Sequence, residues 1–136
     1  METKFKALAG AGALAIAVAA GSLAPQAPAS AQATAFLYCF VSPNSSPGGP
    51  AGLCSSNYPS DTYSALFEVR NLPAGNYSFV WTNEIGQILP CTTYRCTVQY
   101  LGRLQTTDTI YVNYVDQQTG QSNTLARVVS IGGGPL

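Results

Sequence analysis

Histidine is absent from the sequence, and both of its lysines, Lys4 and Lys6, lie close to the N-terminus. Without histidine, a chain lacks Ser–His and Cys–His nucleophile activation and the usual ligands of hydrolytic metal sites. If the lysines leave with a processed leader, Ser–Lys dyads and Schiff bases are excluded as well. The composition therefore predicts a protein that is not an enzyme and that holds no metal and no cofactor.

Long apolar runs are also missing, except for the alanine-rich stretch 7–20 that follows the two lysines. Two overlapping small-x-small sites come next and end at Ala31 and Ala33. This three-part layout predicts a secretory signal peptide over residues 1–33, cleaved after Ala31 or Ala33. The run is shorter and less hydrophobic than the roughly 20 apolar residues of a membrane-spanning helix. We therefore expect a soluble product, secreted or periplasmic, with residues 34–136 as one domain and no membrane span. Its alanine-rich signal favours a bacterial source.

Charges are scarce after residue 33, where four arginines stand against five acids at scattered positions. Nucleic-acid binding depends on clustered cations that neutralise phosphates, so DNA and RNA are excluded as partners. The remaining catalytic chemistry is a carboxylate pair, as in glycoside hydrolysis. Asp108 and Asp116 lie at predicted strand ends, where aspartate commonly forms turns, and the sequence gives Glu68 and Glu84 no local partner. The acids are therefore predicted to be structural.

Four cysteines, Cys39, Cys54, Cys91 and Cys96, all follow the predicted signal. An even number in an exported chain predicts two disulfides. Among the three possible connectivities we favour the local pairs, Cys39–Cys54 and Cys91–Cys96. Loop entropy gives them about 3 and about 2 kcal/mol of stabilisation, respectively. Zinc fingers and redox pairs favour a Cys-x2-Cys spacing, which does not occur here.

Short runs rich in tyrosine, threonine and valine alternate with turn signals, and no stretch has helical periodicity. A proline- and glycine-rich loop covers 42–61, Gly120 suits a hairpin turn, and a flexible tail is expected over 132–136. About seven strands of this kind predict an all-β, immunoglobulin-like antiparallel β-sandwich. The predicted strands are 35–41, 63–70, 76–82, 87–89, 96–101, 109–115 and 121–131.

Residues 67–86, FEVRNLPAGNYSFVWTNEIG, resemble the strand–LPAGxY–strand unit of bacterial extracellular immunoglobulin-like and PKD-like modules. The resemblance concerns the fold: Pro73 and Gly75 would shape a turn between two sheets, and Tyr77 would cap it. Separately, the run from Cys91 to Cys96 is similar to the small disulfide hairpin of neocarzinostatin-type chromoproteins. Those are secreted sandwiches with two disulfides that carry an enediyne in a cleft, so this resemblance implies a ligand cleft.

All eight tyrosines follow the predicted signal. Tyr58 and Tyr94 lie in loops closed by, or next to, the predicted disulfides, and Arg95 adjoins Tyr94. Exposed tyrosines give large contact areas at low entropic cost. We therefore take Tyr58, Tyr94 and Arg95 as candidate binding residues. The leading hypothesis is a domain that binds an extracellular protein or cell surface. The alternatives are a module for a glycan or small ligand, and a hydrolase inhibitor that presents the Cys91–Cys96 loop.

Overall fold

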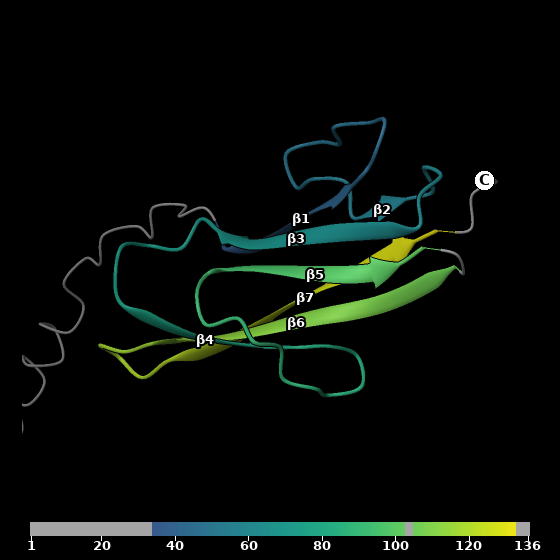
Figure 1. Cartoon of the computed structure of the whole chain (residues 1–136). Coiled ribbons are helices and arrows are strands. Elements are labelled where there is room, and N and C mark those ends of the chain that lie inside the picture. The colour runs from purple at the N-terminus through teal and green to yellow at the C-terminus, as the bar shows by residue number, and fades with distance from the viewer. Residues whose placement is uncertain (1–33, 103–104, 133–136) are drawn as a thin grey trace, which may run out of the picture. The chain divides into compact units, whose positions relative to one another are not determined.

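The computed structural model describes residues 34–102 and 105–132, and its regular elements are strands (Figure 1). Three strands form sheet A, in the order β1-β3-β5, and four form sheet B, in the order β2-β7-β6-β4. The prediction of an all-β chain with two sheets and two disulfides is confirmed. The strands are β1 Phe36–Ser42, β2 Ser55–Ser56, β3 Thr62–Arg70, β4 Tyr77–Thr82, β5 Arg95–Leu101, β6 Thr106–Asp116 and β7 Ser122–Ile131.

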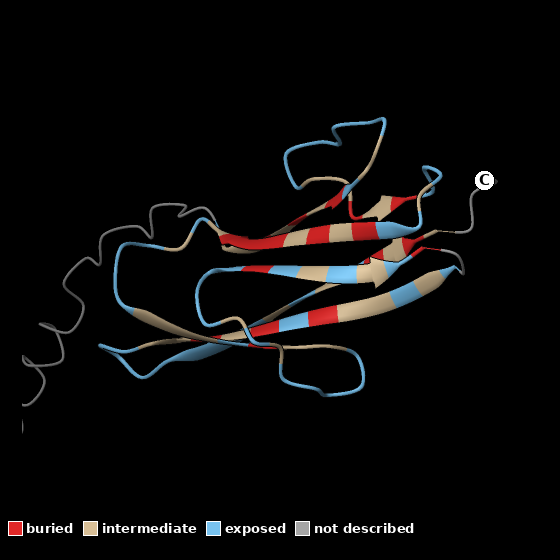
Figure 2. Cartoon of the chain, viewed as in Figure 1, coloured by how far each residue is buried: buried red, intermediate tan, exposed pale blue. Residues whose placement is uncertain are grey.

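The core is built from alternate residues of both sheets, which form one buried cluster. Figure 2 shows this alternation as buried bands that interrupt exposed and intermediate ones along β3 and β6. Phe67 of β3, Trp81 of β4 and Ile110 of β6 are among its largest fully buried side chains. The indole nitrogen of Trp81 donates a hydrogen bond to the carbonyl of Thr93 at 2.8 Å, so its polar atom is satisfied inside the core. Two amphipathic sheets thus share one interior.

The chain passes from sheet A to sheet B through the turn between β3 and β4, as the LPAGxY unit predicts. The hydroxyl of Tyr77 donates to the carbonyl of Pro73 at 2.9 Å, four residues upstream. A tyrosine that bonds back to its own corner fixes the angle at which the next strand begins. The expectation that Tyr77 caps this turn is confirmed.

Both disulfides have the predicted local pairing. Cys39 pairs with Cys54, and their Cα atoms are 5.0 Å apart. Cys91 pairs with Cys96, and there the Cα separation is 5.5 Å. Since no free cysteine remains among the described residues, thiol chemistry is absent from this part of the chain.

The predicted loop 42–61 contains strand-like pairing that the sequence did not indicate. Its residues 51–56, here called the bridging segment, first lie along the outer edge of β1. The N–H groups of Cys39 and Val41 donate to the carbonyls of Ala51 and Leu53, at 3.1 and 3.2 Å. The bridging segment thus extends sheet A beyond β1.

The second half of the bridging segment pairs with the edge of sheet B. The N–H groups of Ser130 and Gly132 donate to the carbonyls of Cys54 and Ser56, at 3.1 and 2.8 Å. Within this half, β2 runs parallel to β7. One short segment therefore joins the two sheets along one side, and the Cys39–Cys54 disulfide fastens it at the crossing point.

One predicted strand is absent from the structure, and another begins earlier than predicted. Residues 87–89 do not form a strand, because only an isolated bridge joins Ile88 to Thr82. The side chain of Ile88 is 75% exposed, so little apolar burial stabilises an extended strand there. The last hairpin forms as predicted at Gly120, which has φ +78°, although β6 begins at Thr106 instead of 109.

Two predictions concern segments outside the described residues. These are the signal peptide, 1–33, and the flexible tail, 132–136, beyond its first residue. Within residues 34–102 and 105–132, no helix is long and apolar enough to cross a membrane.

Candidate functional site

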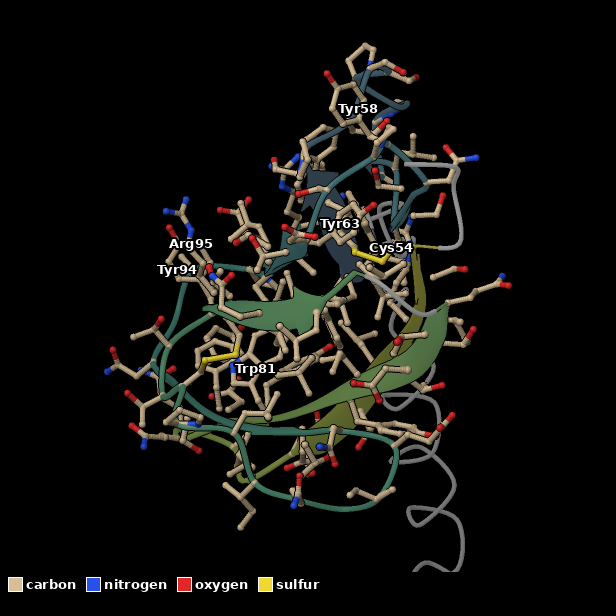
Figure 3. All side chains as sticks on the ribbon, turned by 45° about the vertical axis from the view of Figure 1, so that its right-hand side comes forward. Cys54, Tyr58, Tyr63, Trp81, Tyr94 and Arg95 are labelled. Atoms are coloured by element: carbon tan, nitrogen blue, oxygen red, sulfur yellow. A yellow bond between two sulfur atoms is a disulfide. The ribbon has the colours of Figure 1, made fainter. Side chains whose placement is uncertain are left out.

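The structure places the three predicted binding residues at two separate places (Figure 3). Tyr58 follows β2 and lies shortly before β3, whereas Tyr94 and Arg95 stand where β5 begins, opposite the other end of β3. Both tyrosines are 48% exposed. Their rings are thus accessible, as expected, but they do not form one site.

Arg95 is held against sheet A by Glu68. Its Nε lies 2.7 Å from Oε2 of Glu68, while Nη2 of Arg70 lies 2.8 Å from Oε1. Glu68 is only 6% exposed, and its two partners are arginines rather than a second carboxylate. Arg70 reaches it from the same strand, and Arg95 reaches it from the neighbouring strand, β5.

The two arginines also stack on aromatic rings. The guanidinium carbon of Arg70 lies 3.5 Å from the ring centroid of Tyr38, and that of Arg95 lies 5.7 Å from the ring of Tyr94. Burial by itself would raise the pKa of Glu68. Hydrogen bonds from Arg70 and Arg95 to the carboxylate, together with the positive charges of both arginines, outweigh this effect of burial. They hold the pKa of Glu68 below its ordinary value. Arg95 is therefore part of a fixed cluster on the sheet surface.

The backbone of the Cys91–Cys96 loop is bound to sheet A as well. The N–H of Val69 donates to the carbonyl of Tyr94 at 2.9 Å, which extends the pairing of β3 with β5 by one step. The loop is therefore paired with sheet A at Tyr94, while residues 92–95 are all exposed.

A polar pocket of about 370 Å³ lies where the bridging segment meets β7. Its polar side chains are hydroxyls and amides, and none of its described lining residues is charged. The polar lining residues are Asn44, Ser55, Ser56, Asn57, Gln105 and Ser130, and Leu53 and Gly132 complete the lining. Tyr58 is not among the lining residues, but its N–H donates to Oγ of Ser56 at 3.2 Å, so it stands beside the pocket.

The outer surface of sheet B is a second notable surface. The outward residues of β4, β6 and β7, here called the uncharged face, are serine, threonine, asparagine, alanine, valine and tyrosine. Val80, Tyr111 and Val128 are 47%, 37% and 55% exposed on it. The loop after β4 adds Ile85 and Ile88 at its rim, each 75% exposed. The sequence analysis missed this face, which appears only when three strands lie side by side.

Two acids that the sequence separates by 24 residues meet beside this rim. Oδ1 of Asp108 accepts the N–H of Glu84 at 3.1 Å, and its Oδ2 accepts the hydroxyl of Tyr100 at 2.9 Å. Burial, followed by the hydrogen bond to Asp108, raises the pKa of Tyr100 far above its ordinary value. Both carboxylate oxygens of Asp108 are thus engaged in holding the loop and β5 in place.

Metal-ligating groups do not gather in the described part of the chain, where no three residues among histidine, cysteine, aspartate and glutamate are placed to hold an ion. Comparison with known proteins gives no further identification: no family model, no curated protein and no solved structure matches this chain.

Proposed function

We propose that residues 34–136 are an exported immunoglobulin-like domain that is not an enzyme and that binds an extracellular protein through the uncharged face. In this proposal the domain acts by contact alone, and the loops and disulfides serve to hold the two sheets. The proposal has two parts, the fold and the binding surface, and each has its own support.

The strand order supports the immunoglobulin-like fold. If β1, β3 and β5 are strands A, B and E, then β4, β6 and β7 are C, F and G, and the two sheets divide them as that fold does. Trp81 lies on β4, where immunoglobulin domains carry their buried tryptophan on strand C. The chain departs from antibody domains in its disulfides, because neither of them joins β3 to β6.

The observation that carries the binding proposal is the composition of the uncharged face. Val80, Tyr111 and Val128 expose apolar surface among small polar groups, and none of the outward residues of the three strands is charged. Exposed apolar patches rimmed by polar residues commonly mark protein-binding surfaces. A partner that buried a charge against this face would leave it unpaired, which is costly. The matching surface on the partner is therefore itself uncharged.

Substitution of Val128 by aspartate tests this proposal. We expect Val128→Asp to weaken binding to the partner captured from the exporting cell's surface by about tenfold or more, because a carboxylate would be desolvated without a counter-charge. The matched control is Leu101→Asp, since Leu101 is 77% exposed at the end of β5 in the other sheet. Affinity is measured by surface plasmon resonance, and melting temperatures show that both variants fold.

Equal binding by the wild type and Val128→Asp would refute the proposed surface. An equal loss of affinity in Leu101→Asp would refute it as well.

The alternative of a hydrolase inhibitor has less support. Arg95 is engaged with Glu68, and the backbone of Tyr94 is paired with Val69 of β3, so neither residue stands on a free loop.

A further inference from the structure

We propose that the polar pocket between the bridging segment and β7 is a binding site for a neutral saccharide or polyol. The lining of this site shares only Ser130, at the end of β7, with the uncharged face, and the site takes a different class of ligand. The saccharide site can therefore be tested independently of the proposed protein partner.

The chemistry of the lining selects the ligand class. Serine hydroxyls and the amides of asparagine and glutamine each donate and accept hydrogen bonds, and a sugar hydroxyl does the same. Phosphates and carboxylates require cationic partners, and hard metal ions require carboxylates or several carbonyls. The described lining supplies no charged side chain. Its volume of about 370 Å³ falls within the range of small-molecule sites.

The walls of the pocket are fixed by their own hydrogen bonds. Nδ2 of Asn44 donates to the carbonyl of Ser55 at 2.6 Å, and Oγ of Ser56 donates to the carbonyl of Pro43 at 2.5 Å. Cys54, which is held by the disulfide to Cys39, directly precedes Ser55 and Ser56. A site that is already ordered loses less conformational entropy when a ligand binds.

Four other lining side chains remain available to a ligand. Ser55, Asn57, Gln105 and Ser130 form no side-chain hydrogen bond with any residue in the described ranges. They come from three segments: the bridging segment with the residue after it, the residue before β6, and β7. Their convergence on one hollow gives a ligand several hydrogen-bonding groups at once.

Tyr58 supplies an apolar surface beside the pocket. Its ring is 48% exposed, and its carbonyl accepts the hydroxyl of the buried Tyr63, which fixes the loop (Figure 3). An exposed aromatic face next to hydroxyl and amide groups suits a sugar, because a pyranose has both C–H faces and hydroxyl edges. Tyr58 is therefore assigned to the rim of this site.

The test is a titration of the ¹⁵N-labelled domain followed by NMR. The probes are sorbitol and the neutral tetrasaccharides of glucose (α- and β-linked), mannose and N-acetylglucosamine, with tetragalacturonate as a charged counterpart. We expect saturable shifts of the amides of Ser55, Asn57 and Ser130 with at least one neutral probe and none with tetragalacturonate. Asn57→Ala and Gln105→Ala should each weaken that binding about fivefold, and Tyr58→Ala should weaken it at least as much. Gln118→Ala, in the distant β6–β7 turn, should leave it unchanged.

The proposal is overturned if none of the neutral probes gives saturable shifts at the pocket, if the shifts centre on Val80, Tyr111 and Val128 instead, or if tetragalacturonate binds equally well. It is also overturned if Gln118→Ala weakens binding as much as Gln105→Ala does. Melting temperatures show that each variant folds. Val128→Asp should bind the saccharide normally, and Asn57→Ala should bind the protein partner normally, so failure of one proposal is distinguishable from failure of the other.

Discussion

Glu68 shows how a single buried charge is made compatible with the surface of a sheet. It occupies an outward position of β3, yet Arg70 and Arg95 cover it so that it is almost fully buried. A buried carboxylate without partners would favour its neutral form, whereas two guanidinium partners favour the ionised form. The pKa of Glu68 is therefore lowered in the folded state. An acid that looked solitary in the sequence thus links two strands of sheet A.

The lowered pKa of Glu68 predicts acid sensitivity. A group whose pKa is lower in the folded protein contributes stability above its unfolded pKa, here about 4.5, and loses it as pH falls through the folded value. Between pH about 6 and about 3, Glu68→Gln should lose less unfolding free energy than the wild type does. At neutral pH this variant should be destabilised by about 1–2 kcal/mol, a modest figure because both arginines are partly exposed.

Urea denaturation at both pH values measures this effect. Glu84→Gln is the control, because Glu84 lies in an exposed loop and its exchange should change stability by less than about 0.5 kcal/mol. A Glu68→Gln variant with the same acid response as the wild type would contradict the role given to this ion-pair cluster.

At the scale of elements, the bridging segment decides how the two sheets are joined. Arg127 of β7 reinforces it by donating to the carbonyls of Leu37, Ala51 and Gly52, at 3.0, 2.7 and 3.1 Å. Gly52 has φ +81° and packs so closely on β1 that a Cβ atom there would lie 2.1 Å from the carbonyl oxygen of Cys39. Only glycine fits such a position, since both the backbone conformation and the contact exclude a side chain.

Gly52→Ala is therefore predicted to cost more than about 3 kcal/mol of unfolding free energy, because backbone atoms must move. Gly120→Ala is the matched control, since Gly120 has a similar φ of +78° with open space around its Cα. It should cost only about 1–2 kcal/mol, the penalty of the left-handed conformation. Chemical denaturation measures the unfolding free energy of both variants. Equal losses of unfolding free energy would mean that the bridging segment can shift to admit the new Cβ atom without destabilising the fold.

At the scale of the whole molecule, three surfaces with different chemistry lie on one small scaffold. The arginine–glutamate cluster lies on sheet A, the uncharged face lies on sheet B, and the polar pocket lies where the bridging segment meets β7. The two disulfides contribute unequally to this scaffold. Cys39–Cys54 joins positions 15 residues apart and holds the bridging segment between the sheets, whereas Cys91–Cys96 joins positions 5 residues apart within one loop.

Replacement of each cysteine pair by serine tests this difference. Loss of Cys39–Cys54 should cost about 3 kcal/mol and loss of Cys91–Cys96 about 2 kcal/mol. Hydrogen exchange should rise at the amides of Ser130 and Gly132 in the first variant alone, because these amides bond to the bridging segment. Unchanged protection at both amides would show that the segment holds its place without the disulfide.

The sequence by itself determined the all-β class, the order of most strands, the local disulfide pairing and the corner at Tyr77. These features follow from signals within short stretches: alternation of apolar residues, turn residues, and the spacing of cysteines. Only the tertiary structure decided the partners of Glu68, the pairing of the bridging segment, the uncharged face and the polar pocket. Each of these depends on residues from separate strands whose relative register is set by packing. A proline- and glycine-rich stretch such as 42–61 also has no periodic pattern from which its hydrogen bonds to β1 and β7 could be read.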